Sequence, residues 1–231
     1  DGFLFPNING IKGAVVKLMD KDYQKQLAIK AGLTIAKGQT ISIKNGKYTV
    51  PDSITFPCFT KPEISFLGNK KCMKRCDDMA ELTAVLDDVA KVADCPILVE
   101  DYIEIEKEYG MLGFCDGSKA YIPAMIHKAA IGNGSHKGVT LLGEVIPSEK
   151  YQEIRDKLAS LLESEGFMGL FDVDLYEMDG VIYFNELNLR LGAFGYAIMC
   201  AGINLPGMFI KKLTGQDYKN DVTTVSKQII C

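Results

Sequence analysis

The sequence is poor in the residues and apolar runs that build zinc sites and membrane spans. Its 231 residues include only two histidines, His127 and His136, so a zinc site is not expected, even though Cys72 and Cys76 could share a helix face. The seven cysteines are odd in number and scattered, which indicates reduced thiols and a cytoplasmic location. No apolar run approaches the roughly 20 residues that a membrane-spanning helix needs.

The sequence also lacks an excess of basic charge. Its net charge of −4 provides no electrostatic attraction for nucleic acid or for acidic membranes, so we expect neither as a partner. With 47% hydrophobic and 24% charged residues, the composition is that of a globular protein with a substantial core. No internal repeat or low-complexity tract interrupts it.

Helical and hairpin patterns alternate along the chain. Residues 80–92 carry Leu82, Val85, Leu86 and Val89 at the spacing of an amphipathic helix. Two apolar runs, 109–115 and 119–125, flank an Asp-Gly pair at residues 116–117, which indicates a β-hairpin. Antiparallel hairpins interleaved with helices predict an α+β fold and argue against a doubly wound parallel sheet.

The segment FDVDLYEMDGVIYFNELNLRLG, residues 171–192, is the most informative part of the chain. Asp174 lies in one β-type run, Glu186 and Asn188 end the next, and Asp179-Gly180 lies between the two runs. A hairpin would bring the three oxygen-bearing side chains together, with Glu186 and Asn188 on one side of their strand. Hard oxygen ligands suit Mg²⁺. The alternative is a surface hairpin with ordinary solvated acids.

Two further segments have the composition of phosphate- and nucleoside-binding elements. Lys61 ends the apolar run 56–61, and the basic loop SFLGNKK follows at residues 65–71, so ammonium and backbone N–H groups could meet phosphates. Glu100 follows the apolar run 96–99, where strand-edge backbone could hold an adenine, and Glu108 could accept both ribose hydroxyls. The alternative for both segments is solvated charge at strand ends.

Taken in order, the segments LMDKDYQKQLAIKAGL, FPCFTKP, ILVEDYIEIEKEY and FDVDL…YFNELNLRLG resemble an ATP-grasp domain, from about residue 18 to residue 215. The resemblance is strongest to the carboxylate–amine ligase branch, which includes D-alanine–D-alanine ligases and carbamoyl-phosphate-synthetase-like enzymes. It implies two α+β lobes with antiparallel sheets that grip ATP between them. The implied divisions are an N-terminal segment 1–17 left from a preceding domain, lobes at 18–97 and 98–217, and a tail at 218–231.

The resemblance also implies roles for single residues on the nucleotide. Lys21 and Lys61 would contact phosphates, with Lys61 also catalytic. The loop 65–71 is less rich in glycine and serine than the family's usual form, so either Lys70 or Lys71 could supply its phosphate contact. The remaining nucleotide contacts are a hinge segment for adenine and a carboxylate for ribose: Glu100, Tyr102 and Ile103, and Glu108.

On the metal and substrate side, the resemblance implies that Asp174, Glu186 and Asn188 bind Mg²⁺ or Mn²⁺. Arg190 would be catalytic at the acyl-phosphate site, although Leu189 replaces the proline of the family's Asn-Pro-Arg motif. Residues 126–138 form a predicted polar loop that could contact the acceptor substrate or simply be a mobile loop. Its candidate side chains are His127, Lys128, His136 and Lys137.

The implied activity is an ATP-dependent ligase that activates a carboxylate as an acyl phosphate and joins it to an amine, with both substrates small molecules. Two alternatives stay open at this point. One is a regulatory nucleotide-binding domain without chemistry, and the other is a small-molecule kinase on the same fold. Members of the family carry a domain before this one, so we expect a longer protein of which this chain is a part.

Overall fold

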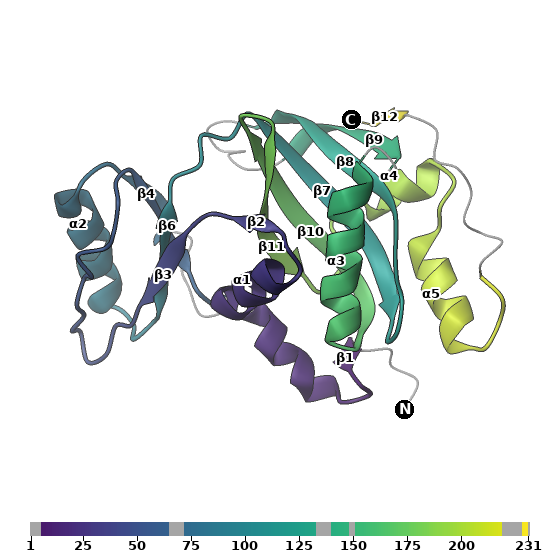
Figure 1. Ribbon diagram of the computed structural model, residues 1–231, viewed down its shortest axis with the longest axis horizontal. Helices are drawn as coiled ribbons and strands as arrows, with labels where there is room; N and C mark the ends of the chain where they lie inside the picture. The colour runs from purple at the N-terminus through teal and green to yellow at the C-terminus, as the bar shows by residue number, and fades with distance from the viewer. Residues whose placement is uncertain (1–5, 65–71, 133–139, 148–150, 219–227, 231) are drawn as a thin grey trace.

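The computed structural model describes residues 6–64, 72–132, 140–147, 151–218 and 228–230, which form two sheets with helices packed on them (Figure 1). The strands are β1 (Asn7–Ile8), β2 (Thr34–Ile35), β3 (Gly38–Ile41), β4 (Cys58–Pro62), β5 (Lys74–Cys76), β6 (Ile97–Asp101), β7 (Lys107–Asp116), β8 (Ala120–Ile131), β9 (Thr140–Pro147), β10 (Phe167–Met178), β11 (Val181–Asn188) and β12 (Gln228–Ile230). The helices are the 3-10 helix η1 (Lys12–Met19), α1 (Lys21–Lys30), α2 (Met79–Ala90), α3 (Gln152–Ser164), α4 (Gly195–Cys200) and α5 (Leu205–Leu213).

The larger sheet has eight strands and supplies most of the core. Its order is β12-β9-β8-β7-β10-β11-β2, with β1 paired to the start of β10, and all neighbours are antiparallel except β11 and β2. The predicted hairpins β7–β8 and β10–β11 are confirmed. At the second turn Asp179 and Gly180 have φ values of 51° and 72°, the left-handed conformation that an Asp-Gly hairpin turn requires.

Helices cover both faces of this sheet, and β7 is accordingly buried on both sides from Tyr109 to Asp116. On one face α1 and α3 pack against Phe171, Val173 and Leu175 of β10 (Figure 1). On the other face α4 and α5 pack against Leu112 and Phe114 of β7. Within the described residues, no helix is both long and apolar enough to cross a membrane.

The smaller sheet has the antiparallel order β3-β6-β4-β5 and is covered by α2. The helix predicted over residues 80–92 is confirmed, and its apolar face, Leu82, Val85 and Leu86, is buried. The Asp78 side chain caps the helix by accepting a hydrogen bond from the Glu81 N–H. Strand β6 runs from this sheet toward β7 of the large sheet, and the division of the chain at residue 97 stays a prediction.

One local expectation is wrong. Residues 126–131, taken as the start of a polar loop, are the end of β8, which pairs with β9 as far as Ile131 and Thr140. A polar side chain on a strand faces a defined side of the sheet, so Lys128 has a fixed place and is not part of a mobile loop.

Candidate active site

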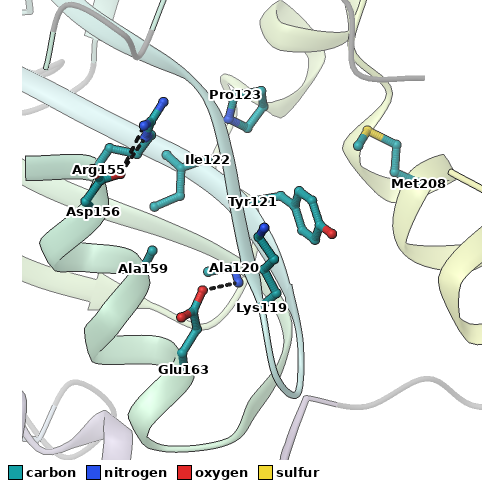
Figure 2. A pocket seen from close by; sticks show the side chains of 10 residues that line it. All are labelled: Lys119, Ala120, Tyr121, Ile122, Pro123, Arg155, Asp156, Ala159, Glu163 and Met208. Carbon is teal, nitrogen blue, oxygen red and sulfur yellow. Dashed lines mark hydrogen bonds and ion pairs between the residues drawn. The ribbon is translucent and has the colours of Figure 1, made fainter. Parts of the chain in front are cut away.

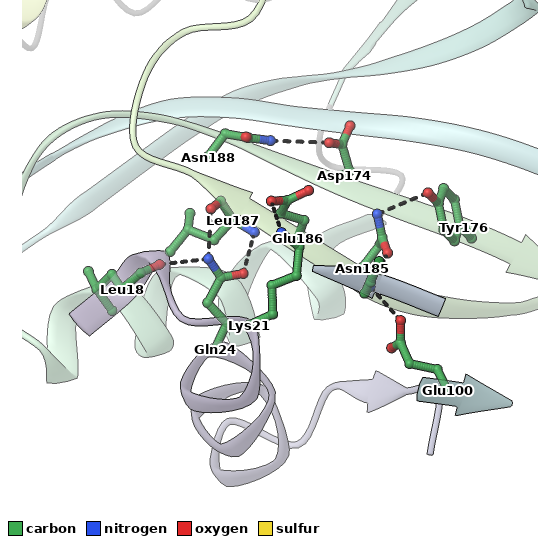
Figure 3. A network of polar contacts seen from close by, with 11 residues as sticks. Leu18, Lys21, Gln24, Glu100, Asp174, Tyr176, Asn185, Glu186, Leu187 and Asn188 are labelled. Atoms are coloured by element: carbon green, nitrogen blue, oxygen red, sulfur yellow. Dashed lines mark hydrogen bonds and ion pairs between the residues drawn. The ribbon is translucent and has the colours of Figure 1, made fainter. Parts of the chain in front are cut away.

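The hairpin β10–β11 brings the predicted metal ligands together. Asp174 pairs with Glu186 and Asp172 pairs with Asn188, so these four side chains lie on one face of the sheet. The Asn188 Nδ2 donates a hydrogen bond of 3.1 Å to the Asp174 Oδ2 (Figure 3).

The donor set of this face fits Mg²⁺. Two carboxylates and an amide oxygen are hard ligands, and Mg²⁺ typically takes one or two carboxylates and keeps several waters. Across the described residues, no three His, Cys, Asp or Glu side chains gather where a metal ion could be held. A site here would therefore consist of Asp174, Glu186 and Asn188 with water or phosphate oxygens completing the shell.

A β-bulge in the hairpin adds a residue that the sequence analysis missed. Leu175 pairs with Phe184 although Asp174 pairs with Glu186, so Asn185 is the extra residue of β11. Its side chain donates to the Tyr176 hydroxyl at 2.9 Å and accepts from the Lys61 Nζ at 3.1 Å. The bulge thus connects the metal-type hairpin to the small sheet.

Helix α1 holds Lys21 beside the hairpin. Lys21 is the first residue of the helix, and its Nζ lies 2.9 Å from the Glu186 Oε1. The Gln24 Nε2 donates to the carbonyls of Leu18 and Leu187, and the Leu187 N–H donates back to the Gln24 Oε1 (Figure 3). This buried clamp fixes the helix, and with it Lys21, against β11.

Lys61 and Glu100 form a second buried group of charges. Their exposed fractions are 5% and 6%, and the Lys61 Nζ lies 2.5 Å from the Glu100 Oε2. Glu100 also pairs with Lys25, one helical turn after Lys21. Burial lowers the pKa of Lys25, against the opposing charge of Glu100. The side chain of Glu100 is therefore bonded to two lysines, a partnership that its sequence context did not predict.

Tyr102 and Ile103 lie in the connection from β6 to β7, between the two sheets. The Tyr102 N–H donates to the Pro57 carbonyl at 3.0 Å, and the Arg75 guanidinium stands 4.5 Å from its ring centroid. The role of Tyr102 and Ile103 as a hinge that holds adenine stays a prediction.

Lys128 connects the predicted ribose carboxylate to the predicted metal site. Its Nζ lies 2.7 Å from the Asp174 Oδ1 and 3.7 Å from the Glu108 Oε2. Burial raises the pKa of Glu108. Burial would lower the pKa of Lys128, but the charges of Asp174 and Glu108 outweigh it and raise that pKa. Glu108 and Lys128 also line a hollow of about 270 Å³.

Asp172 is the second residue of this face that the sequence analysis missed. Its Oδ1 is buried without a hydrogen-bond partner among the described residues, while the Gly192 N–H hydrogen-bonds the carboxylate. Burial and the charge of Asp174 raise the pKa of Asp172 to about 7. Arg190 is exposed, and its Nη1 lies 3.4 Å from the Leu191 carbonyl. The sequence did contain a signal for Asp172, because it precedes Asp174 by two residues, the spacing that places two strand residues on the same face.

His127, the remaining candidate that the structure describes, borders the same hollow as Glu108 and Lys128. Its Nδ1 lies 3.7 Å from Glu144, and its ring centroid lies 5.3 Å from that of Tyr109. Four predicted residues lie outside the described residues: Lys70, Lys71, His136 and Lys137.

Another hollow, of about 510 Å³, lies elsewhere, between β8, α3 and α5 (Figure 2). An ion pair of Arg155 with Asp156 and a hydrogen bond from the Ala120 N–H to Glu163 border it. None of the predicted site residues lines this hollow.

Comparison with known proteins yields distant relatives. No protein-family model matches the chain. The C-terminal section of the carbamoyl phosphate synthase large chain from Methanocaldococcus jannaschii is 24% identical over 220 residues, which cover 91% of this chain and 35% of that protein. A D-alanine–D-alanine ligase from Bacillus cytotoxicus is 28% identical over 190 residues, covering 75% of this chain and 51% of the ligase. The chain thus spans about a third to a half of these relatives.

A solved structure gives the same result for the fold. The biotin carboxylase domain of a 2-oxoglutarate carboxylase from Hydrogenobacter thermophilus, in complex with MgADP, ADP and bicarbonate, matches with a TM-score of 0.75. The match covers 95% of this chain and 51% of that chain at 16% identity. Together with the two sheets and the order of the motifs, these relatives identify the chain as an ATP-grasp domain, distantly related to carbamoyl phosphate synthases and D-alanine–D-alanine ligases.

Proposed function

We propose that this domain is the catalytic core of an ATP- and magnesium-dependent carboxylate–amine ligase. The reaction would convert a small-molecule carboxylate to an acyl phosphate and then to an amide, with release of ADP and phosphate. The observation that supports it is the convergence of Lys21 and Lys61 on the face that carries Asp174, Glu186 and Asn188. Ammonium groups that could bind phosphate therefore lie beside oxygen ligands that could bind Mg²⁺.

The nucleotide would lie between the two sheets. The side chain of Glu100 is bonded to Lys25 and Lys61 and is therefore not available to the adenine. The backbone N–H and C=O groups around Tyr102 and Ile103 would hold the adenine instead. Glu108 would accept the ribose hydroxyls, beside the hollow it lines with Lys128. A lysine of the loop 65–71 would cover the phosphates, as the resemblance implies.

The phosphates would reach the face of β10–β11. Asp174, Glu186 and Asn188 would hold the ion, which supplies charge neutralisation at the β- and γ-phosphates when bound. Both carboxylates already attract cations, Lys128 at Asp174 and Lys21 at Glu186. Lys21 would then exchange its carboxylate partner for a phosphate oxygen, and Lys61 would neutralise charge that develops during transfer.

The protein forms no covalent bond with a substrate in the proposed reaction. A substrate carboxylate oxygen attacks the γ-phosphorus, the bond to the ADP oxygen breaks, and an acyl phosphate forms. Arg190, two residues beyond Asn188, would face that acyl phosphate. An amine nitrogen then attacks the acyl carbon, phosphate leaves, and the nitrogen loses a proton as the amide forms. The rate enhancement would come from positioning of the reactants and from electrostatic stabilisation of the transition state by Lys61 and Arg190.

The first test is ADP release by the full-length protein with Mg-ATP and pools of amino acids and small carboxylates, bicarbonate included. Glu186→Gln should lower turnover at least a hundredfold without unfolding the protein, because a lost metal ligand costs several kcal/mol of transition-state stabilisation. Asp179→Asn is the matched control. It makes the same chemical change in the exposed turn of the same hairpin, and we expect normal turnover.

The outcomes separate the alternatives. ADP release that needs both a carboxylate and an amine, and that Glu186→Gln abolishes, supports the ligase. A phosphorylated product that forms without any amine would assign a kinase. Tight binding of Mg-ATP with no turnover in any pool would assign a regulatory binding domain. Normal Mg²⁺ dependence and turnover in Glu186→Gln would refute the metal assignment.

A further inference from the structure

Asp172 is an acidic side chain on the site face of β10 that the proposed chemistry does not use. It precedes Asp174 by two residues, about 7 Å along the strand, and its side chain lies on the same face. Its Oδ1 is buried and has no hydrogen-bond partner in the described part of the chain. Leaving a buried charged acceptor unpaired is costly, so a donor from a ligand is expected there.

The order of side chains along β10 indicates which ligand this is. Tyr176 lies on the nucleotide side, where Asn185 connects it to Lys61. Asp174 follows at the proposed metal, then Asp172, and then Leu170, which packs against the apolar cluster of α4 and α5. Since the γ-phosphate is the end of the nucleotide, the groups that react with it lie beyond the metal. Asp172 is therefore on the acceptor side.

Glycines on both sides let the backbone lie close against the carboxylate of Asp172. A Cβ at Gly192 would lie 2.1 Å from the Asp172 Oδ2, and a Cβ at Gly110 would lie 3.4 Å from its Oδ1. The residue as a whole is only partly buried, and the terminal torsion of an aspartate is soft. The carboxylate can therefore turn toward a donor of a ligand without a change of backbone.

The charges around Asp172 favour a cation. The charges of Lys128 and Arg190 act on Asp172, but Lys128 is bonded to Asp174 at 2.7 Å, and the Arg190 guanidinium lies beside the Leu191 carbonyl. A neutral donor would supply a hydrogen bond only, whereas an ammonium would donate hydrogen bonds and add to the compensation of the negative charge.

We propose that Asp172 binds the amine acceptor of the ligase reaction in its ammonium form, which loses one proton to solvent before the nitrogen attacks the acyl carbon, so that the domain selects primary aliphatic amines. The proposal rests on the ligase function and names its acceptor class. Arg190 on the same side would face the anionic acyl phosphate. The two partners of the bond-forming step would thus meet charges of opposite sign.

The kinetic test uses two nucleophiles that differ in charge. Hydroxylamine is uncharged at neutral pH and traps acyl phosphates as hydroxamates, whereas amino acids present an ammonium. In the full-length protein, Asp172→Asn should lower kcat/KM for amino-acid acceptors at least tenfold. Hydroxamate formation and the Mg²⁺ dependence should stay within twofold of wild type. Asp172→Ser repeats the test without an amide that could pair with Asp174.

Three results would overturn the proposal. An equal loss with hydroxylamine and amino acids would mean that Asp172 supports the fold or the first half-reaction. A raised Mg²⁺ requirement would make it a ligand of a second metal ion. Unchanged amino-acid kinetics would mean that it has no part in acceptor binding.

A binding measurement separates this proposal from the ligase function itself. Calorimetry on the MgADP-loaded protein should give at least tenfold tighter binding of glycinamide, a cationic amine, than of N-acetylglycinamide, its uncharged N-acetylated analogue. Asp172→Asn should remove that difference. If wild type forms no hydroxamate with any carboxylate, the ligase function fails, and the two affinities still decide the role of Asp172. Equal affinities in wild type would overturn it.

Discussion

Two aspartates on neighbouring strands of the large sheet have opposite surroundings. Asp116 ends β7 and pairs with Met168, four residues along β10 from Asp172. One of its oxygens accepts hydrogen bonds from the N–H groups of Ser118 and Lys119 and from the Ser118 hydroxyl. Its other oxygen lies 3.1 Å from the Lys212 Nζ and 3.3 Å from the Tyr218 hydroxyl.

Asp172, by contrast, keeps one buried oxygen without a partner in the described residues. The pKa values follow this contrast. Burial would raise the pKa of Asp116, but the N–H groups of Lys119 and Ser118 and the charge of Lys212 outweigh it and lower that pKa to about 2. Burial and Asp174 raise that of Asp172 to about 7. A carboxylate whose partners all come from its own chain stabilises the fold, whereas one that lacks a partner is available to a ligand.

Identical substitutions at the two positions test this contrast most strongly. Asp116→Asn should lower the free energy of unfolding by about 3 kcal/mol. The amide of asparagine removes the negative charge, and its NH₂ group would face the donors that now bond to the carboxylate. Asp172→Asn should change it by less than about 0.5 kcal/mol or raise it, because no hydrogen bond of the buried oxygen is lost. Urea unfolding of the two variants measures both values. Equal losses would contradict the assignment of one aspartate to structure and the other to ligand binding.

Acid unfolding measures the part of the stability from Asp116 that depends on its negative charge. A carboxylate whose pKa is lowered by folding stabilises the protein above its unfolded pKa of about 4 and loses that contribution as the pH falls toward 2. About two pKa units correspond to about 2.7 kcal/mol, of which about 2 kcal/mol is lost between pH 5 and pH 2. The difference in unfolding free energy between wild type and Asp116→Asn should therefore shrink by this amount from pH 5 to pH 2. A difference independent of pH would assign the effect to packing.

The sequence alone could predict the features that depend on local patterns. The Asp-Gly turns, the apolar face of α2 and the meeting of Asp174 with Glu186 and Asn188 all follow from periodicity and a two-residue turn. The α+β class and the antiparallel hairpins followed from the same patterns.

Features that depend on long-range contacts could not be predicted in this way. The bulge at Asn185 breaks the two-residue period that the strand argument assumes. The bonds of Glu100 to Lys25 and Lys61 join three separate elements, and Lys128 was placed in a loop because the glycine-rich residues that begin at Gly132 masked the end of a strand. Spacing shows that Asp172 shares a face with Asp174, but only packing determines that its Oδ1 lacks a partner.

The two glycines beside Asp172 give the finest test, because they differ in how closely they approach it. Gly192→Ala would place a Cβ 2.1 Å from the Oδ2, so the carboxylate must move, at a cost of about 1 kcal/mol in stability. Gly110→Ala would place one 3.4 Å from the Oδ1, a tight but tolerable contact, and we expect a smaller change. Thermal unfolding and glycinamide binding measure both effects. Combining Gly192→Ala with Asp172→Ser should restore the stability, because the shorter side chain leaves room for the methyl group, but not the binding. Restored binding would mean that the amine is held by another group of the cleft.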